Sequence, residues 1–137
     1  MKKTVHILHW VGGIAGLGVL ALGLFIWISG MNLPTLQMVH ASLGLIFVLS
    51  LLIIGIIAVQ NRGTRLLGAV CIVYAPLVPV FGIVQMILLV GDLHWIIRTA
   101  HLLVGLVAFV LLGMTGMRYL RLKQSEREVS KVPQLVR

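Results

Sequence analysis

The chain alternates long apolar runs with short polar turns. Four runs follow one another, over residues 5–29, 34–60, 66–90 and 93–120. Each has the ~20 apolar residues that an α-helix needs to cross a hydrocarbon layer about 30 Å thick. The turns SGMNLPT, QNRGTR and GDLH are short, so neighbouring helices should be antiparallel. The pattern predicts an all-α fold, an integral membrane up-down four-helix bundle.

The positions of Lys and Arg predict the orientation of this bundle. One side receives ten of them: Lys2, Lys3, Arg62, Arg65, Arg118, Arg121, Lys123, Arg127, Lys131 and Arg137. The other side receives only Arg98. The positive-inside rule then places both termini in the cytoplasm. We expect one domain over residues 1–121 and a polar cytoplasmic tail over 122–137, which prolongs the last helix by a turn or two and then frays.

Composition supports a membrane location and narrows the chemistry. The chain is 60% hydrophobic and only 10% charged, whereas soluble domains carry about 25% charged residues. The net charge of +8 gathers at the ends of apolar runs, so we expect lipid rather than nucleic acid as its partner. We expect a multi-pass protein of the cytoplasmic membrane of a bacterium or archaeon. The acidic residues, Asp92, Glu126 and Glu128, lie at or beyond segment ends, which argues against a transporter driven by a membrane-embedded acid.

Two histidines lie inside apolar runs, where ionisable residues are costly and usually functional. His40 is six residues into the second run and His101 seven residues into the fourth, about 9 and 10 Å from the outer side. Each is followed four residues later by a glycine, Gly44 or Gly105, which leaves room on the same helix face. Imidazoles at equal depth can bind one haem iron from opposite sides.

Other residues extend this haem hypothesis. Arg98 lies one turn outward from His101, where its guanidinium would meet a haem propionate. His94, Trp95 and Gln37 are candidates for a quinone pocket beside the haem, although His94 and Trp95 also suit a membrane interface.

The first run contains a third copy of the spacing, His9 and Gly13, at the cytoplasmic side. A second haem there would need a ligand at the inner end of the fourth run, where only the thioethers of Met114 or Met117 are available.

Three of the four runs resemble helices of bacterial cytochrome b561 proteins: HILHWVGGIAGLGVLALGL, LQMVHASLGLIFVL and RTAHLLVGLVAF. The resemblance implies a four-helix bundle with b-type haem between helices and electron transfer to or from quinone, a redox partner protein or a larger respiratory complex. It implies that His40 and His101 bind the outer haem and His9 an inner one. The family's second inner ligand corresponds to Thr115 here, which is a departure. One half of a haem A synthase is the second resemblance, but the acidic residue expected for chemistry on haem is missing.

Two functions therefore stay open at this stage. In the first, the chain is a membrane b-type cytochrome that carries electrons. Its cofactor is haem b, and His40 and His101 bind the haem iron. Oxidation of a diffusing substrate at the haem edge would make it a quinone-linked oxidoreductase, and the sequence does not decide this. In the second, the chain is a haem-free anchor or assembly subunit of a larger complex, and its histidines only join helices.

Overall fold

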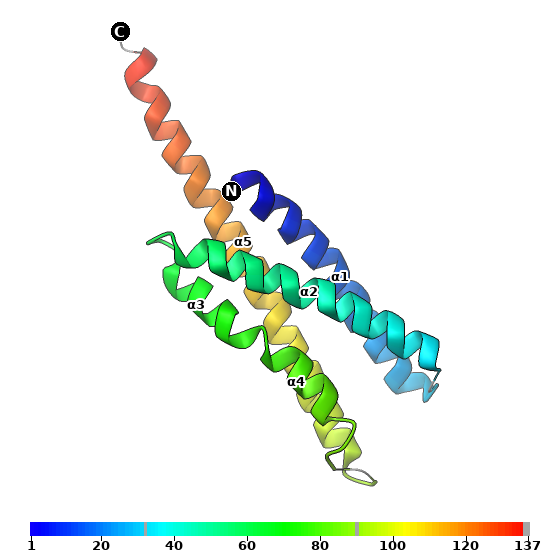
Figure 1. Ribbon diagram of the computed structural model, residues 1–137. Coiled ribbons are helices and arrows are strands. Elements are labelled where there is room, and N and C mark those ends of the chain that lie inside the picture. Colours follow the sequence, from blue (N-terminus) through cyan, green and yellow to red (C-terminus); the bar gives the residue numbers. More distant parts are fainter. Residues whose placement is uncertain (32, 90, 136–137) are drawn as a thin grey trace.

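The computed structural model describes residues 1–31, 33–89 and 91–135, with side chains up to residue 130, and these residues are helical apart from the turns between them (Figure 1). The helices are α1 (Lys2–Ser29), α2 (Pro34–Val59), α3 (Arg65–Tyr74), α4 (Leu77–Val84) and α5 (His94–Leu135). Because α3 and α4 form one apolar stretch, four stretches are long and apolar enough to span a membrane. The prediction of an all-α four-helix membrane bundle is confirmed.

The third span is broken and shorter than predicted. Proline has no backbone N–H, and the break between α3 and α4 falls at Ala75–Pro76. Pro79 lies in the first turn of α4, where a missing N–H is tolerated. The expected helix over 66–90 ends at Val84, because the chain then turns and reaches left-handed backbone at Leu89 (φ 52°) and Gly91 (φ 103°).

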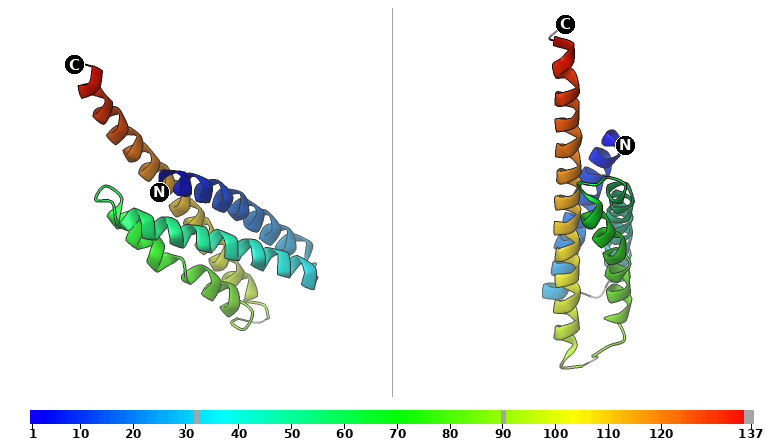
Figure 2. Two further views of the ribbon diagram at one scale, coloured as in Figure 1. Left: turned by 45° about the horizontal axis from the view of Figure 1, so that its top comes forward. Right: turned by 90° about the vertical axis from the view of Figure 1, so that its left-hand side faces the viewer.

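The last helix is longer than predicted. It spans 42 residues, about 63 Å, and extends well beyond the other helices (Figure 2). Side-chain pairs one turn apart support the extension: Lys123 donates to Glu126 over 2.7 Å and Gln124 to Glu128 over 3.5 Å. The expectation that the helix frays after a turn or two is therefore wrong.

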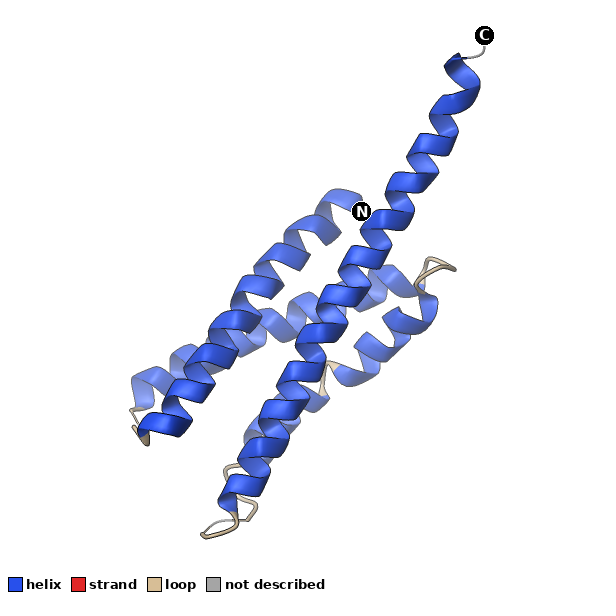
Figure 3. Ribbon diagram, turned by 180° about the vertical axis from the view of Figure 1, so that it is seen from behind, coloured by secondary structure: helices blue, strands red, loops and turns tan. Residues whose placement is uncertain are grey.

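Both termini lie at the same end of the bundle, together with the turn between α2 and α3 (Figures 1 and 3). We call this the basic end, because nine Lys and Arg residues of the described part of the chain fall here, whereas Arg98 lies towards the opposite end. The opposite end carries the turns from α1 to α2 and from α4 to α5. α1 lies along α2, and α4 lies along α5.

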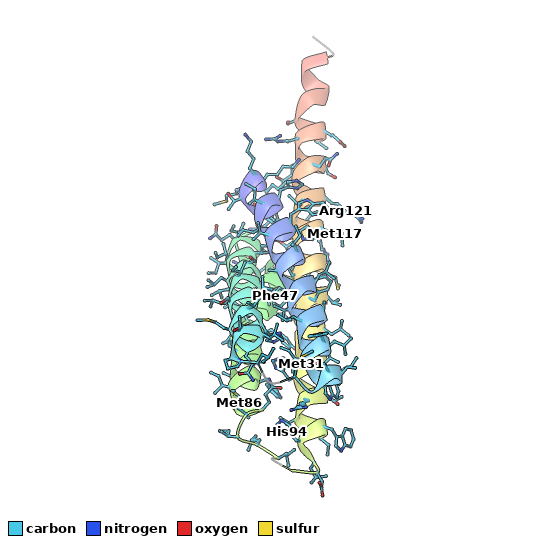
Figure 4. All side chains as sticks on the ribbon, turned by 90° about the vertical axis from the view of Figure 1, so that its right-hand side faces the viewer. Met31, Phe47, Met86, His94, Met117 and Arg121 are labelled. Atoms are coloured by element: carbon cyan, nitrogen blue, oxygen red, sulfur yellow. The ribbon has the colours of Figure 1, made fainter. Side chains whose placement is uncertain are left out.

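The buried core lies in the half of the bundle towards the basic end. It includes Val5, Ala15, Phe47, Leu51, Ile54, Cys71, Ala108, Leu112 and Tyr119, and Figure 4 shows Phe47 deep between the helices. Small residues permit this close packing. A Cβ on Gly12 of α1 would lie 2.7 Å from the Cβ of Ser50 on α2. Between α2 and α3, a Cβ on Gly68 would collide with the backbone of Gly55 and Val59.

The half towards the opposite end is packed loosely. The described residues of α1 after residue 16, of α2 before residue 47 and of α4 after residue 78 include none that is buried. In α5 before residue 108, Ile97 is the one buried residue that the structure describes. Many apolar side chains on the outside of all four spans are exposed, as expected for surfaces that contact lipid. The helices therefore hold one another firmly in one half and leave the other half open.

Replacement of Gly68 by alanine should destabilise the bundle, because the added methyl group meets helix backbone, which cannot move aside as a side chain can. We expect a loss of about 1–3 kcal/mol, measured by reversible unfolding in mixed micelles. Gly113→Ala is the matched control, since a Cβ there meets nothing within 4 Å. Equal stabilities for the two variants would contradict this account of the α2–α3 contact.

Candidate functional site

His40 of α2 and His101 of α5 face each other in the loosely packed half. Their ring centroids are 6.4 Å apart, and the ring planes are inclined by 55°. Both residues are half-buried. The two histidines that the sequence placed at equal depth are thus brought together by the fold, although they are 61 positions apart in the chain.

Each ring lies against a glycine on a neighbouring helix. A Cβ on Gly23 of α1 would lie 2.9 Å from Cε1 of His40, and a Cβ on Gly82 of α4 would lie 3.4 Å from Cε1 of His101. The backbone of Val19, one turn before Gly23, also approaches the His40 ring. Sequence reasoning missed these two contacts, because they depend on how each helix is rotated about its axis. The only signal was the presence of glycine in the first and third apolar runs.

The predicted glycines Gly44 and Gly105 lie beside open space rather than against the rings. A Cβ on Gly44 would meet nothing within 4 Å, and one on Gly105 would meet only Leu20, at 3.9 Å. One turn from each histidine, the helix surface is therefore uncrowded, which matches the room that the sequence pattern suggested.

The buried ring nitrogens at this site lack partners. Nδ1 of His40 and Nδ1 of His101 are buried and have no hydrogen-bond partner among the described residues. An unpartnered buried donor or acceptor costs about 1–3 kcal/mol. Nδ1 of His9 and Nδ1 of His94 are in the same state, so this feature is not specific to the facing pair.

The spacing of the rings agrees with a shared metal ion. A bond from a metal ion to an imidazole nitrogen is about 2.0 Å, so two rings that bind one ion from opposite sides have centroids about 6.3 Å apart. The inclination of the planes does not matter, because each ring can rotate about its own bond to the metal. In residues 1–31, 33–89 and 91–135, no group of three or more His, Cys, Asp or Glu could hold a metal ion. Two imidazoles alone suit a metal whose other ligands come from a macrocycle, as in haem.

The remaining candidates of the outer half surround this pair more loosely. Arg98 is exposed, one turn from His101 towards the opposite end. His94 lies at the start of α5 (Figure 4), half-buried, with a buried Nδ1 that has no partner among the described residues. Trp95 and Gln37 are exposed. Their roles as propionate and quinone contacts stay predictions.

The surroundings of His9, the candidate for a second haem, are closely packed. A Cβ on Gly116 of α5 would lie 2.6 Å from Nδ1 of His9, so the ring lies directly against that helix. Next to it, Thr115 is fully buried, and its hydroxyl lies 3.2 Å from Sγ of Cys71.

The other residues proposed for that site do not gather around His9. Gly13 has nothing within 4 Å of an added Cβ. Met114 and Met117 are about half exposed, which fits methionines on a lipid-facing surface. The space beside Gly13 is as open as that beside Gly44, so the close packing is confined to the contact of the His9 ring with Gly116.

Comparison of the chain with protein-family models, with curated proteins and with solved structures finds no match. The assignment of a function therefore depends on the geometry of the site and on the sequence motifs.

Proposed function

We propose that this chain is a membrane b-type cytochrome that holds one haem b between His40 and His101 and exchanges electrons in the half of the bundle away from the basic end. The observation that supports it best is the facing pair of half-buried imidazoles, 6.4 Å apart between centroids. The open surface beside Gly44 and Gly105 adds to it.

The residues of the chain would divide the work of holding the group. His40 and His101 would bind the haem iron, Gly23 and Gly82 would hold the rings in position, and Arg98 would neutralise a propionate. When bound, haem supplies one-electron chemistry at iron, and two axial histidines leave no coordination position for oxygen. The protein's part is then to orient the iron and to surround it with apolar side chains of low dielectric constant, which tune its potential.

The electron partner that we propose is a quinone at the end of the bundle opposite the basic end. His94 is seven residues before His101, on the same face of α5, and its ring is half-buried. An imidazole N–H can donate to a quinone carbonyl oxygen. By the positive-inside rule the basic end faces the cytoplasm, so this exchange would take place at the outer side of a bacterial or archaeal cytoplasmic membrane.

Replacement of either His40 or His101 by glycine should abolish bound haem. One axial ligand does not hold haem b firmly, so we expect the content to fall below about a tenth of that of the unaltered protein. The measurement is a reduced-minus-oxidised spectrum with pigment extraction from the purified protein. His6→Gly, an exposed histidine of α1, is the control. Added imidazole should restore the spectrum of the glycine variants, which a misfolded chain would not allow. If the chain is instead a haem-free anchor subunit, none of these samples should contain haem.

Gly23→Ala should weaken haem binding without removing a ligand. The new methyl group would lie 2.9 Å from Cε1 of His40 and displace that ring. Displacing a group that orients a metal ligand typically costs about 10–100-fold in affinity. Haem titration of the apoprotein measures this, with Gly113→Ala as the control. Unchanged affinity and an unchanged spectrum would show that Gly23 does not position the ring.

Haem extraction should return one haem for each chain. The ring of His9 is packed against Gly116, and the position of the second inner ligand is held by Thr115, whose hydroxyl is engaged with Cys71 and is no ligand for haem iron. His9→Ala should therefore leave the haem count and the spectrum unchanged. A count of two, falling to one in the His9 variant, would contradict this part of the proposal and favour an inner haem.

A further inference from the structure

A cavity at the basic end lies outside the proposed haem site. It is open to the surface, its volume is about 370 Å³, and it is bordered by Met1 at the start of α1, the end of α2, the turn from α2 to α3 and the part of α5 that extends past the core. The turn is packed on α5, since a Cβ on Gly63 would lie 2.6 Å from Cδ1 of Leu122. Figure 4 shows this level of α5 at Arg121, beyond the end of the densely packed core.

The lining of the cavity combines apolar and cationic side chains. Ile57 and the buried Tyr119 lie on the side of the core. Arg62 and Lys123 contribute two positive charges, and Gln60 adds amide donors. Glu126 contributes one negative charge, but it is already engaged by Lys123 at 2.7 Å. Arg62 has no ion pair with any residue that the structure describes.

This arrangement favours a singly charged anion with a non-polar part. The guanidinium group presents a planar set of donors that matches a phosphate oxygen pair, and lysine adds a point charge. The volume lies within the range of small-ligand sites, about 300–1,000 Å³. The cavity also lies where the apolar spans α2 and α5 give way to charged residues, the depth at which lipid headgroups meet the protein.

We propose that this cavity binds the phosphate group of an anionic phospholipid, with Arg62 and Lys123 as the contacting cations and Ile57 and Tyr119 against the glycerol and upper acyl region. The site is independent of haem. It would fix the long α5 helix to the α2–α3 turn at the membrane surface, since one headgroup would be held by residues from both.

The test uses the full-length protein in a neutral detergent, titrated with phosphatidylglycerol, with phosphatidylcholine and with soluble glycerol phosphate. Binding is measured by native mass spectrometry and by the rise in melting temperature. We expect phosphatidylglycerol to bind and to raise the melting temperature, and the other two compounds to have little effect. Glycerol phosphate binding as tightly as phosphatidylglycerol would overturn the lipid assignment in favour of a soluble phosphate compound.

Two double variants distinguish binding of the lipid in the cavity from its general electrostatic attraction to the basic end. Arg62→Gln with Lys123→Gln removes the two lining cations, and at about 1 kcal/mol for each the affinity should fall about thirtyfold. Arg65→Gln with Arg127→Gln removes the same charge from exposed residues that do not line the cavity. Equal losses for the two double variants would overturn the proposal.

A third variant should strengthen binding. Glu126→Gln removes the carboxylate that competes for Lys123, so phosphatidylglycerol should bind several-fold more tightly than to the unaltered protein. A gain of affinity cannot arise from misfolding. No gain, or a loss, would mean that Lys123 does not face the phosphate.

Discussion

Close contact between small residues in one half of the bundle sets the geometry of the whole molecule. Gly12 against Ser50 and Gly68 against the backbone of α2 bring the helices together at distances that no larger side chain would allow. Lipid tails are as apolar as the side chains of the protein, so this packing, rather than a hydrophobic driving force, holds membrane helices together. With the helices fixed at the basic end, their outer halves are positioned relative to one another without needing to touch.

The proposed haem site depends on this difference between a closely packed half and a loosely packed half of the bundle. A group as large as haem needs helices that are held in a constant orientation and yet stand apart, and the half away from the basic end provides both. His40 and His101 lie close together in this half, and each ring lies against a glycine of another helix. All four spans thus contribute to one site: α2 and α5 through the imidazoles, α1 and the α3–α4 span through Gly23 and Gly82. The position of a second inner ligand is held by Thr115, which is why we propose one haem rather than two.

At the basic end, interactions between charged groups act together with apolar contacts. There the spans emerge from the apolar region, α5 continues as a helix of charged residues, and the α2–α3 turn lies against it at Leu122. A lipid phosphate shared by Arg62 and Lys123 would join these two parts by charge, where the apolar packing has ended. In this account the two ends of the bundle have separate ligands, and the dense core lies between the two sites.

The sequence by itself determined the class of the protein. The lengths of the apolar runs predicted four spans, and the positions of Lys and Arg predicted one basic end. The equal depth of His40 and His101 was enough to expect that the two residues meet. These properties depend only on distance along a helix, which the 1.5 Å rise fixes. Rotation of each helix about its axis is not fixed in that way, and it decided the rest: Gly23 and Gly82 lie against the rings, while Gly44 and Gly105 lie beside open space. The structure also fixed two helix ends that the apolar pattern did not predict. α4 ends at Val84, where the backbone turns, and α5 continues to Leu135, supported by side-chain pairs one turn apart.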